Sequence, residues 1–301
     1  MADALARSAS DAAGTLRELA AAMAAVLSPV MHDDASREAR ELLAALHDMP
    51  RHWVALDGES GVAPEEWARA LHAAERRAAG APLQYAAGQA SFRHLTLEVD
   101  ERVLIPRPET EQLVELVLGA TASMRGGIAV DVGTGSGAIA LALASEGTFD
   151  RIIGTDISSD ALALAEANLA RCANSLRADV ELRVGSLLGP VHERPLRAVV
   201  SNPPYIAWEE ADALPASVRD WEPAVALFSG EHGMATTARL VREAAGALEP
   251  GGLLALEVDT RRASIAAELA ASHGAYDEVK VLLDLTGRER FVVARRRETP
   301  E

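Results

Sequence analysis

The feature of the sequence that most constrains the fold is a glycine-rich segment between an apolar run and an alanine-rich run, AVDVGTGSGAIALALA at residues 129–144. Glycine permits a tight turn and lets the backbone approach a ligand closely. The first turn of the following helix offers free N–H groups and the positive end of the helix dipole to an anion. The segment is therefore typical of the strand, loop and helix that open a cofactor-binding α/β domain.

After this segment the sequence alternates between strand-like and helix-like runs, which indicates a largely parallel sheet covered on both faces. The predicted strands are Ile128–Val132, Arg151–Ile157, Val180–Val184, Leu196–Ser201, Leu253–Val258, Glu278–Leu283 and Arg290–Ala294. The predicted helices are Gly137–Ser145, Asp160–Ala170, Thr236–Leu248 and Arg261–Ser272. Because the last two strands are joined closely, we expect a doubly wound, seven-stranded sheet with an antiparallel edge.

The residues before this domain have a different texture. Up to about residue 80 the apolar positions recur at helical spacing, which predicts a small helical domain with breaks at Ser28–Pro29, Met49–Pro50 and between Gly58 and Pro64. From Phe92 to Ile105 apolar and polar residues alternate around Asp100–Glu101, which predicts a hairpin or short strand pair that bridges two domains. We therefore expect a helical domain over 1–80, a hairpin linker over 81–110 and an α/β domain over 111–301.

Composition and single residues exclude several classes of protein. The formal net charge of −16 disfavours a large nucleic-acid partner, and the one lysine, Lys280, follows no glycine-rich loop, which excludes a P-loop. The one cysteine, Cys172, cannot form an internal disulfide, and the histidines lack metal-ligand spacing, so we expect no metal site. Asp11, Arg17 and Glu18 interrupt the alanine-rich N-terminus, so we expect neither signal peptide nor membrane span but a cytoplasmic protein.

The glycine-rich segment fits two cofactor motifs equally well. Gly133, Gly135 and Ala138 match the G-x-G-x-x-G/A pattern of dinucleotide sites. Asp131 with Gly133, Gly135 and Gly137 matches the D-x-G-x-G-x-G loop of S-adenosylmethionine-dependent methyltransferases. This segment alone therefore leaves the cofactor open.

The second predicted strand ends in an acid, Asp156, in the run IIGTDIS. A carboxylate at this strand tip can accept hydrogen bonds from both hydroxyl groups of a ribose, which either cofactor would supply. Ser158 or Ser159 is better placed to cap the following helix, so we assign Asp156 to the ligand.

The fourth predicted strand stops at Asn202-Pro203-Pro204-Tyr205. The prolines end the strand and hold Asn202 in an extended conformation at its tip. The side-chain carbonyl of Asn202 and the backbone carbonyl of Pro203 can hold a planar NH₂ group, against which the ring of Tyr205 can lie. Such a clamp suits methyl transfer to a planar nitrogen and has no use in hydride transfer.

Several segments resemble, in order, those of the HemK/PrmC family, the protein-(glutamine-N5) methyltransferases that modify the Gly-Gly-Gln motif of peptide chain release factors. They are PLQYAAGQASF at 82–92, VLIPRPETE at 103–111, DVGTGSGAIALALA, GTDIS, SNPPYI and EPAVALFSG at 222–230. IPRPETE is the most specific, because nucleic-acid methyltransferases with an Asn-Pro-Pro-Tyr loop lack it. From the residues alone, Glu109 or Thr110 can cap a helix here or line the cofactor pocket.

The resemblance implies a Rossmann-like, seven-stranded class I methyltransferase domain, a helical domain that binds the release factor and a connecting hairpin. We expect a monomer. The implied cofactor is S-adenosyl-L-methionine, held by Asp131, Gly133, Thr134, Gly135, Ser136, Gly137, Asp156, Leu187 and Asn202. The implied substrate residues are Asn202, Pro203, Pro204 and Tyr205, of which Asn202 and Tyr205 are catalytic. The segment Gly185–Leu188 is expected at the adenine, although Ser186 stands where the family usually has Asp. Two alternative acceptors stay open, a glutamine of a ribosomal protein and the N6 amine of adenine in nucleic acid.

Overall fold

A computed structural model describes residues 13–298 of the chain. The chain divides into two compact units, Met1–Ser91 with Ala216–Trp221, and Phe92–Pro215 with Glu222–Glu301. The first twelve residues of the predicted helical domain, Asp11 among them, and the last three residues of the chain lie outside the described residues. The domain limits expected at residues 80 and 110 stay a prediction.

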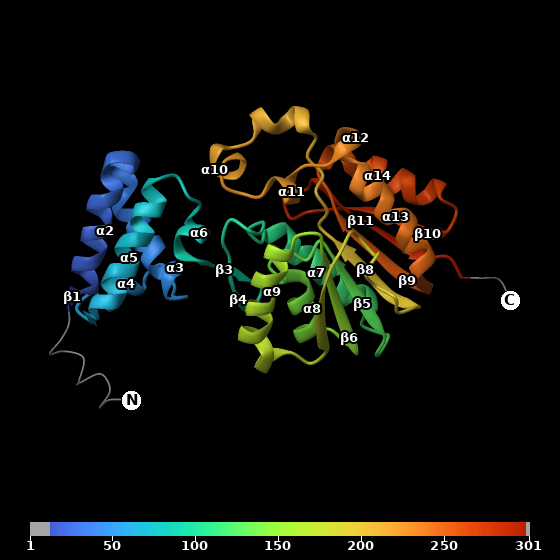
Figure 1. Cartoon of the computed structure of the whole chain (residues 1–301), viewed down its shortest axis with the longest axis horizontal. Helices are drawn as coiled ribbons and strands as arrows, with labels where there is room; N and C mark the ends of the chain where they lie inside the picture. The colour runs from blue at the N-terminus through green and yellow to red at the C-terminus, as the bar shows by residue number, and fades with distance from the viewer. Residues whose placement is uncertain (1–12, 299–301) are drawn as a thin grey trace. The chain divides into compact units, whose positions relative to one another are not determined.

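The first unit consists mainly of helices, of which α2, α3 and α5 pack side by side (Figure 1). Its elements are β1 (Gly14–Thr15), α2 (Leu16–Met31), η1 (His32–Asp34), α3 (Ala35–Leu46), α4 (Trp53–Leu56), β2 (Gly61–Val62), α5 (Pro64–Ala78), α6 (Leu83–Ala87) and, from the separate segment, α10 (Ala216–Arg219). Apolar side chains at helical spacing, such as Leu19, Met23 and Leu42, are fully buried in its core. The helical pattern in the sequence was therefore interpreted correctly.

One predicted break in this unit is wrong. Helix α2 does not stop at Ser28–Pro29 but continues through Pro29 to Met31. Proline removes a single backbone donor, and in the last turn of a helix that loss affects only one intrahelical bond. Burial of Leu27 holds this turn against the core, so the helix tolerates the proline.

The second unit contains a seven-stranded sheet in the order β10-β11-β9-β8-β5-β6-β7. Its strands are β5 (Ile128–Val132), β6 (Arg151–Asp156), β7 (Asp179–Val184), β8 (Leu196–Ser201), β9 (Leu248–Glu257), β10 (Tyr276–Leu283) and β11 (Glu289–Arg296). The five strands β5 to β9 pair in parallel, whereas β11 is antiparallel to both β9 and β10. The predicted doubly wound sheet with an antiparallel edge is confirmed.

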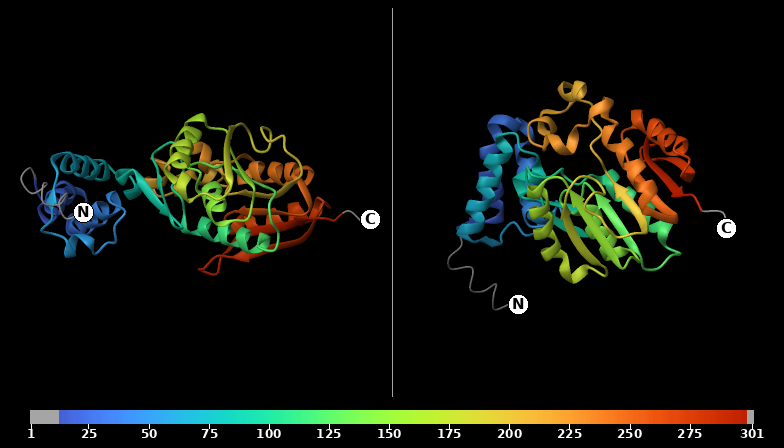
Figure 2. Two further views of the ribbon diagram at one scale, coloured as in Figure 1. Left: turned by 90° about the horizontal axis from the view of Figure 1, so that it is seen from below. Right: turned by 45° about the vertical axis from the view of Figure 1, so that its right-hand side comes forward.

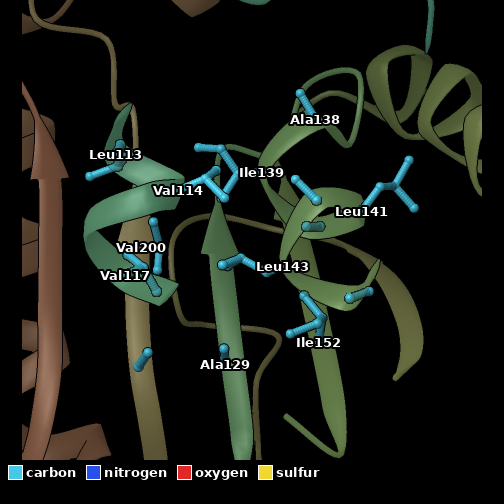
Figure 3. Close-up of a cluster of buried hydrophobic side chains, with 14 of the residues drawn as sticks. Leu113, Val114, Val117, Ala129, Ala138, Ile139, Leu141, Leu143, Ile152 and Val200 are labelled. Atoms are coloured by element: carbon cyan, nitrogen blue, oxygen red, sulfur yellow. The ribbon is translucent and has the colours of Figure 1, made fainter. Parts of the chain in front are cut away.

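Alternate residues of the strands supply two hydrophobic cores, one on each face of the sheet. Ala129 and Val200 pack with residues of α7 and α8 on one face, as Figure 3 shows. Val130 and Val199 pack on the other face with α13 and α14, which lie beside β9–β11 (Figure 2). Cys172, at the end of α9, is buried in the first core, where it packs as a small apolar residue.

The helices of this unit agree with the predicted ones within about two residues where a prediction was made. They are α7 (Pro108–Thr121), α8 (Ala138–Glu146), α9 (Ser159–Cys172), η2 (Ala173–Ser175), η3 (Trp208–Ala213), α11 (Ala224–Leu227), α12 (Gly230–Gly233), α13 (Ala235–Ala247) and α14 (Thr260–Ser272). The short helices between 208 and 233 carry no clear periodicity and were not predicted. Strand β9 begins at Leu248, well before the predicted Leu253.

The expected hairpin exists but its turn was misplaced. Strands β3 (Gln89–Phe92) and β4 (Leu95–Glu98) pair around Arg93–His94 rather than around Asp100–Glu101. Arg93 adopts a left-handed φ of 54° there, and its guanidinium is bonded to Glu146 and Glu115. These long-range ion pairs favour a turn that local alternation does not indicate. The division between the two units falls inside β3.

The topology places the site. The chain runs from the central strand β5 outward through β6 and β7, and then returns to the other side of β5 as β8. The carboxyl ends of β5 and β8 therefore flank the point at which the strand order reverses, where ligands bind in open α/β sheets. Within the described part of the chain, no helix is both long enough and apolar enough to cross a membrane.

Candidate active site

Two adjoining cavities lie beyond the carboxyl ends of the parallel strands. They share the lining residues Gly133, Asp156, Pro204 and Val225. The first is also lined by Arg107, Thr110, Thr134, Gly135, Ser136, Ser158 and Asn202, among others. The second is also lined by Gly185, Ser186, Leu187, Pro203 and Arg239, among others. The glycine loop, the acid at the tip of β6 and the Asn-Pro-Pro segment thus face one connected hollow.

The glycine loop has the backbone conformation that its composition predicts. Gly133, Gly135 and Gly137 adopt φ values of 74°, 53° and 83°, which side chains disfavour. A Cβ atom at Gly133 or Gly135 would meet no atom within 4 Å, so these positions border open space. Gly137 is the N-cap of α8 and lies outside both cavity linings.

Asp131, the last but one residue of β5, holds the glycine loop through its side chain. Its side chain is completely buried, and Oδ2 accepts hydrogen bonds from the Thr134 hydroxyl at 2.6 Å and the Ala140 N–H at 3.0 Å. Burial raises the pKa of Asp131 to about 7, against the opposing effect of these two donors. Asp131 lies outside both cavity linings, and its bonds fix the loop to the start of α8.

Asp156 is bonded to the loop from the side and lines both cavities. Its Oδ2 accepts from the Gly135 N–H and its Oδ1 from the Ser158 N–H, each at 2.9 Å. The cap of α9 is the Ser158 hydroxyl, which accepts from the Ala161 N–H, as the sequence indicated. The carboxylate is therefore held in place by backbone groups, and its remaining lone pairs are available to a ligand.

Asn202 is bonded through its amide nitrogen rather than its oxygen. Its Nδ2 donates to the Thr110 hydroxyl at 3.2 Å, and that hydroxyl donates to Oε2 of Glu257 at 2.8 Å. Oδ1 of Asn202 accepts no hydrogen bond from residues 13–298. Asn202 lines the first cavity, and its Oδ1 is an acceptor that the described residues leave free.

Of the other predicted residues of this site, three line a cavity and Tyr205 does not. Pro204 lines both cavities, Pro203 lines the second, and Leu187 lines the second with a left-handed φ of 51°. Tyr205 lies outside both linings. Burial, together with the nearby Glu257, raises the pKa of its hydroxyl to about 12.

Two acids near the site were missed by the sequence analysis. Glu257 ends β9, is 2% exposed, and has its pKa raised by burial to about 7. Glu222 is buried and forms an ion pair with Arg107, which lines the first cavity. Glu257 had the same signal that revealed Asp156, an acid at the tip of an apolar strand.

The expected role of the IPRPETE segment is partly corrected. The N-cap of α7 is Arg107, whose side chain makes no capping bond within the described chain, and neither Glu109 nor Thr110 takes that place. The capping alternative is therefore wrong. Thr110 lines the first cavity, as the other alternative predicted.

These residues suit a cofactor that carries a nucleoside. The open space at Gly133 and Gly135 admits a ligand against the loop backbone. Asp156 offers a fixed carboxylate to hydroxyl groups, and the second cavity is largely apolar around Ile157, Leu187 and Pro203.

Comparison with known proteins identifies the class to which this protein belongs. The family model of the methyltransferase small domain matches residues 110–216, and that of the PrmC N-terminal domain matches residues 18–88. A methyltransferase from Pyrococcus furiosus has a similar fold, with a TM-score of 0.52 at 20% identity, over 69% of this chain and 92% of that one. The fold and the site therefore define a Rossmann-like methyltransferase.

Two relatives specify the family. The release factor glutamine methyltransferase of Moorella thermoacetica is 43% identical over 240 residues, covering 80% of this chain and 84% of its own length. The enzyme of the same name from Deinococcus radiodurans is 41% identical over 260 residues, covering 86% and 90%. The chain belongs to the release factor glutamine methyltransferase family, and these names do not favour a ribosomal protein or adenine as the acceptor.

Proposed function

We infer that the protein transfers a methyl group to the side-chain amide nitrogen of a glutamine in a peptide chain release factor, within its Gly-Gly-Gln motif. The observation that carries this proposal is Asn202, which lines the same hollow as the glycine loop and Asp156 and whose Oδ1 accepts no hydrogen bond from residues 13–298. Family membership supports the reaction and the acceptor.

The proposed cofactor is S-adenosyl-L-methionine, which supplies an electrophilic methyl group on a sulfonium centre. We assign its binding to the loop Gly133–Gly137 with Asp131 behind it, and to Asp156 and Leu187. Asp156 accepts from the ribose hydroxyl groups, and Leu187 contributes an apolar contact for the adenine. Asp131 acts by holding the loop, since its carboxylate lies outside the cavities.

The substrate amide needs positioning because its nitrogen lone pair is delocalised into the carbonyl group. Asn202 Oδ1 and the Pro203 carbonyl each accept one N–H of the amide, which aims the nitrogen lone pair at the methyl donor. Pro203 and Pro204 restrict the backbone here, so both acceptors are in place before the substrate arrives. The nitrogen becomes acidic as it gains the methyl group, so no strong base is required. Tyr205 stays a proposed contact of the planar amide.

We assign recognition of the release factor to the first unit, whose residues 18–88 match the PrmC N-terminal domain model. The second unit contains every lining residue of both cavities. The two units thus separate binding of the partner from chemistry at its glutamine.

Transfer of label from S-adenosyl-L-methionine to a purified release factor tests the proposal. We expect label on the wild-type factor and none on a factor whose motif glutamine is replaced. The Asn202→Ala variant is expected to lose about 100- to 1,000-fold in kcat, because a preorganised acceptor is removed. Its affinity for the cofactor, measured by calorimetry, is expected to stay within about tenfold of wild type.

Three outcomes would refute parts of this proposal. Equal labelling of both release factors would show that the motif glutamine is not the acceptor. Undiminished turnover by Asn202→Ala would remove the acceptor role of that residue. Binding of NAD in place of S-adenosyl-L-methionine in the calorimeter would overturn the choice of cofactor.

A further inference from the structure

The bonds from Asn202 to Glu257 have a direction that chemistry dictates. An ionised carboxylate can only accept hydrogen bonds, so the hydroxyl hydrogen of Thr110 must point to Glu257. The oxygen of Thr110 is then left with lone pairs, which require a donor. Of the two ends of the Asn202 side-chain amide, only the NH₂ group donates.

Resting on the proposed function, we propose that Glu257 and Thr110 are positioning residues that fix the orientation of the Asn202 amide, so that its oxygen rather than its nitrogen faces the substrate. With the amide turned over, the site would present a donor to the N–H groups of the glutamine and would repel them. The two ends of an asparagine amide have nearly the same shape, so packing alone discriminates weakly between the two orientations. The carboxylate supplies the discrimination.

Burial makes this arrangement specific. Thr110 is 5% exposed and Glu257 2% exposed, so water has little access to replace either partner. In a site of low polarity a missing hydrogen bond costs more than it does at the surface. The three groups come from α7, from the tip of β8 and from the tip of β9, which the sheet brings together.

The arrangement also predicts a pH dependence. A protonated Glu257 can donate to Thr110, whose hydroxyl is then free to donate to Asn202 Oδ1, which reverses the whole chain of bonds. The charged and titratable groups that face Glu257 are Arg290 and Arg107, which favour its ionised form, and Glu109 and Tyr205. The pKa of Glu257 is raised to about 7, chiefly by burial, so the active orientation is lost as the pH falls below neutrality.

Nuclear magnetic resonance tests the orientation without any turnover. The chain has three asparagines, Asn168, Asn174 and Asn202, so ¹⁵N-asparagine labelling gives three side-chain NH₂ signals. Asn168 is buried and donates to the Ser136 and Glu98 carbonyls, and Asn174 is exposed. They serve as internal references for a bonded and a solvated amide.

We expect the Asn202 protons to exchange with water slowly in the wild type, and at least about tenfold faster in Thr110→Val, with Asn168 unchanged. The matched control is Thr237→Val, because the Thr237 hydroxyl is buried and has no partner among the described residues. An Asn202 exchange rate that is the same in wild type and Thr110→Val would overturn the proposal. Unchanged Asn168 signals verify that the variant is folded.

Kinetic measurements are the second test of the positioning role. Thr110→Val is expected to lower kcat about 10- to 100-fold with the cofactor Kd within about threefold, whereas Thr110→Ser, which restores the hydroxyl, recovers most of the turnover. Glu257→Gln is expected to remove the fall of kcat below pH 7. Wild-type turnover in Thr110→Val, or an unchanged pH profile in Glu257→Gln, would refute the positioning role while leaving the proposed function intact. A wild-type enzyme that fails to label the release factor would refute the function, and the exchange measurement would still decide the orientation.

Discussion

Two buried carboxylates of the second unit, Asp131 and Glu257, make similar bonds. Each accepts a hydrogen bond from the hydroxyl of a threonine. The oxygen–oxygen distance is 2.6 Å from Thr134 to Asp131 and 2.8 Å from Thr110 to Glu257. Burial raises the pKa of each to about 7. Glu257 is the last residue of β9 and Asp131 the last but one of β5, so both lie near the carboxyl end of a strand at the same edge of the sheet.

They differ in how far along the chain their partners lie. Asp131 bonds residues three and nine positions away and so fixes backbone, namely the glycine loop and the start of α8. Glu257 bonds a residue 147 positions away, which in turn bonds Asn202, and so fixes the orientation of a side chain. A carboxylate with local partners therefore shapes the cofactor loop, and one with distant partners orients the group that meets the substrate.

The largest expected effect is on the pH dependence of stability, because both acids have a raised pKa. Because the folded pKa of each is raised, the folded protein binds more protons than the unfolded chain, and its free energy of unfolding falls as the pH rises from about 4 to about 7. The rise from 3.8 to about 7 corresponds to about 4 kcal/mol for Asp131, and that from 4.5 to about 7 to about 3 kcal/mol for Glu257. Asp131→Asn and Glu257→Gln should each remove their share of this decrease.

Urea unfolding followed by circular dichroism, across this pH range, measures both shares. The comparison concerns the slope against pH, so a constant loss of stability from altered hydrogen bonds does not affect it. A slope that is unchanged in one variant would show that the corresponding acid does not titrate near neutrality. The two acids would then not share a raised pKa.

The second expected effect is on affinity for the cofactor, which should depend on Asp131 and its partner but not on Glu257 and its partner. Thr134→Val deletes the hydroxyl that Asp131 accepts, which leaves a buried charge with one fewer partner and loosens the loop. We expect the Kd for S-adenosyl-L-methionine to rise about tenfold, whereas Thr110→Val, the same substitution at the other acid, changes it less than about threefold. Calorimetry on the two variants measures this directly. Equal losses of affinity would mean that both acids support the cofactor loop and that the division of roles is wrong.

The same division explains what was predictable from the sequence. The glycine loop, Asp156 and the Ser158 cap are bonded to partners a few residues away or follow from strand periodicity, so local pattern indicated them. The turn at Arg93 depends on Glu146 and Glu115, and the orientation of Asn202 depends on Thr110 and Glu257. No local pattern records such partners, because the sheet topology brings them together. Pro29 was misread for the related reason that burial of Leu27 outweighs a local helix-breaking signal.

The smallest expected effect tests whether a local bond can be removed without loss of ligand affinity. The Ser158 hydroxyl caps α9 by accepting from the Ala161 N–H, whereas the bond from Ser158 to Asp156 comes from its backbone N–H. Ser158→Ala should therefore lower the free energy of unfolding by about 1 kcal/mol and leave the cofactor Kd within about twofold. Ser159→Ala, one residue into the helix on an exposed position, is the matched control and should change neither quantity. If Ser158→Ala weakens cofactor binding as strongly as Thr134→Val does, the Ser158 hydroxyl contacts the ligand in the first cavity, which it lines, and its role is not confined to the helix.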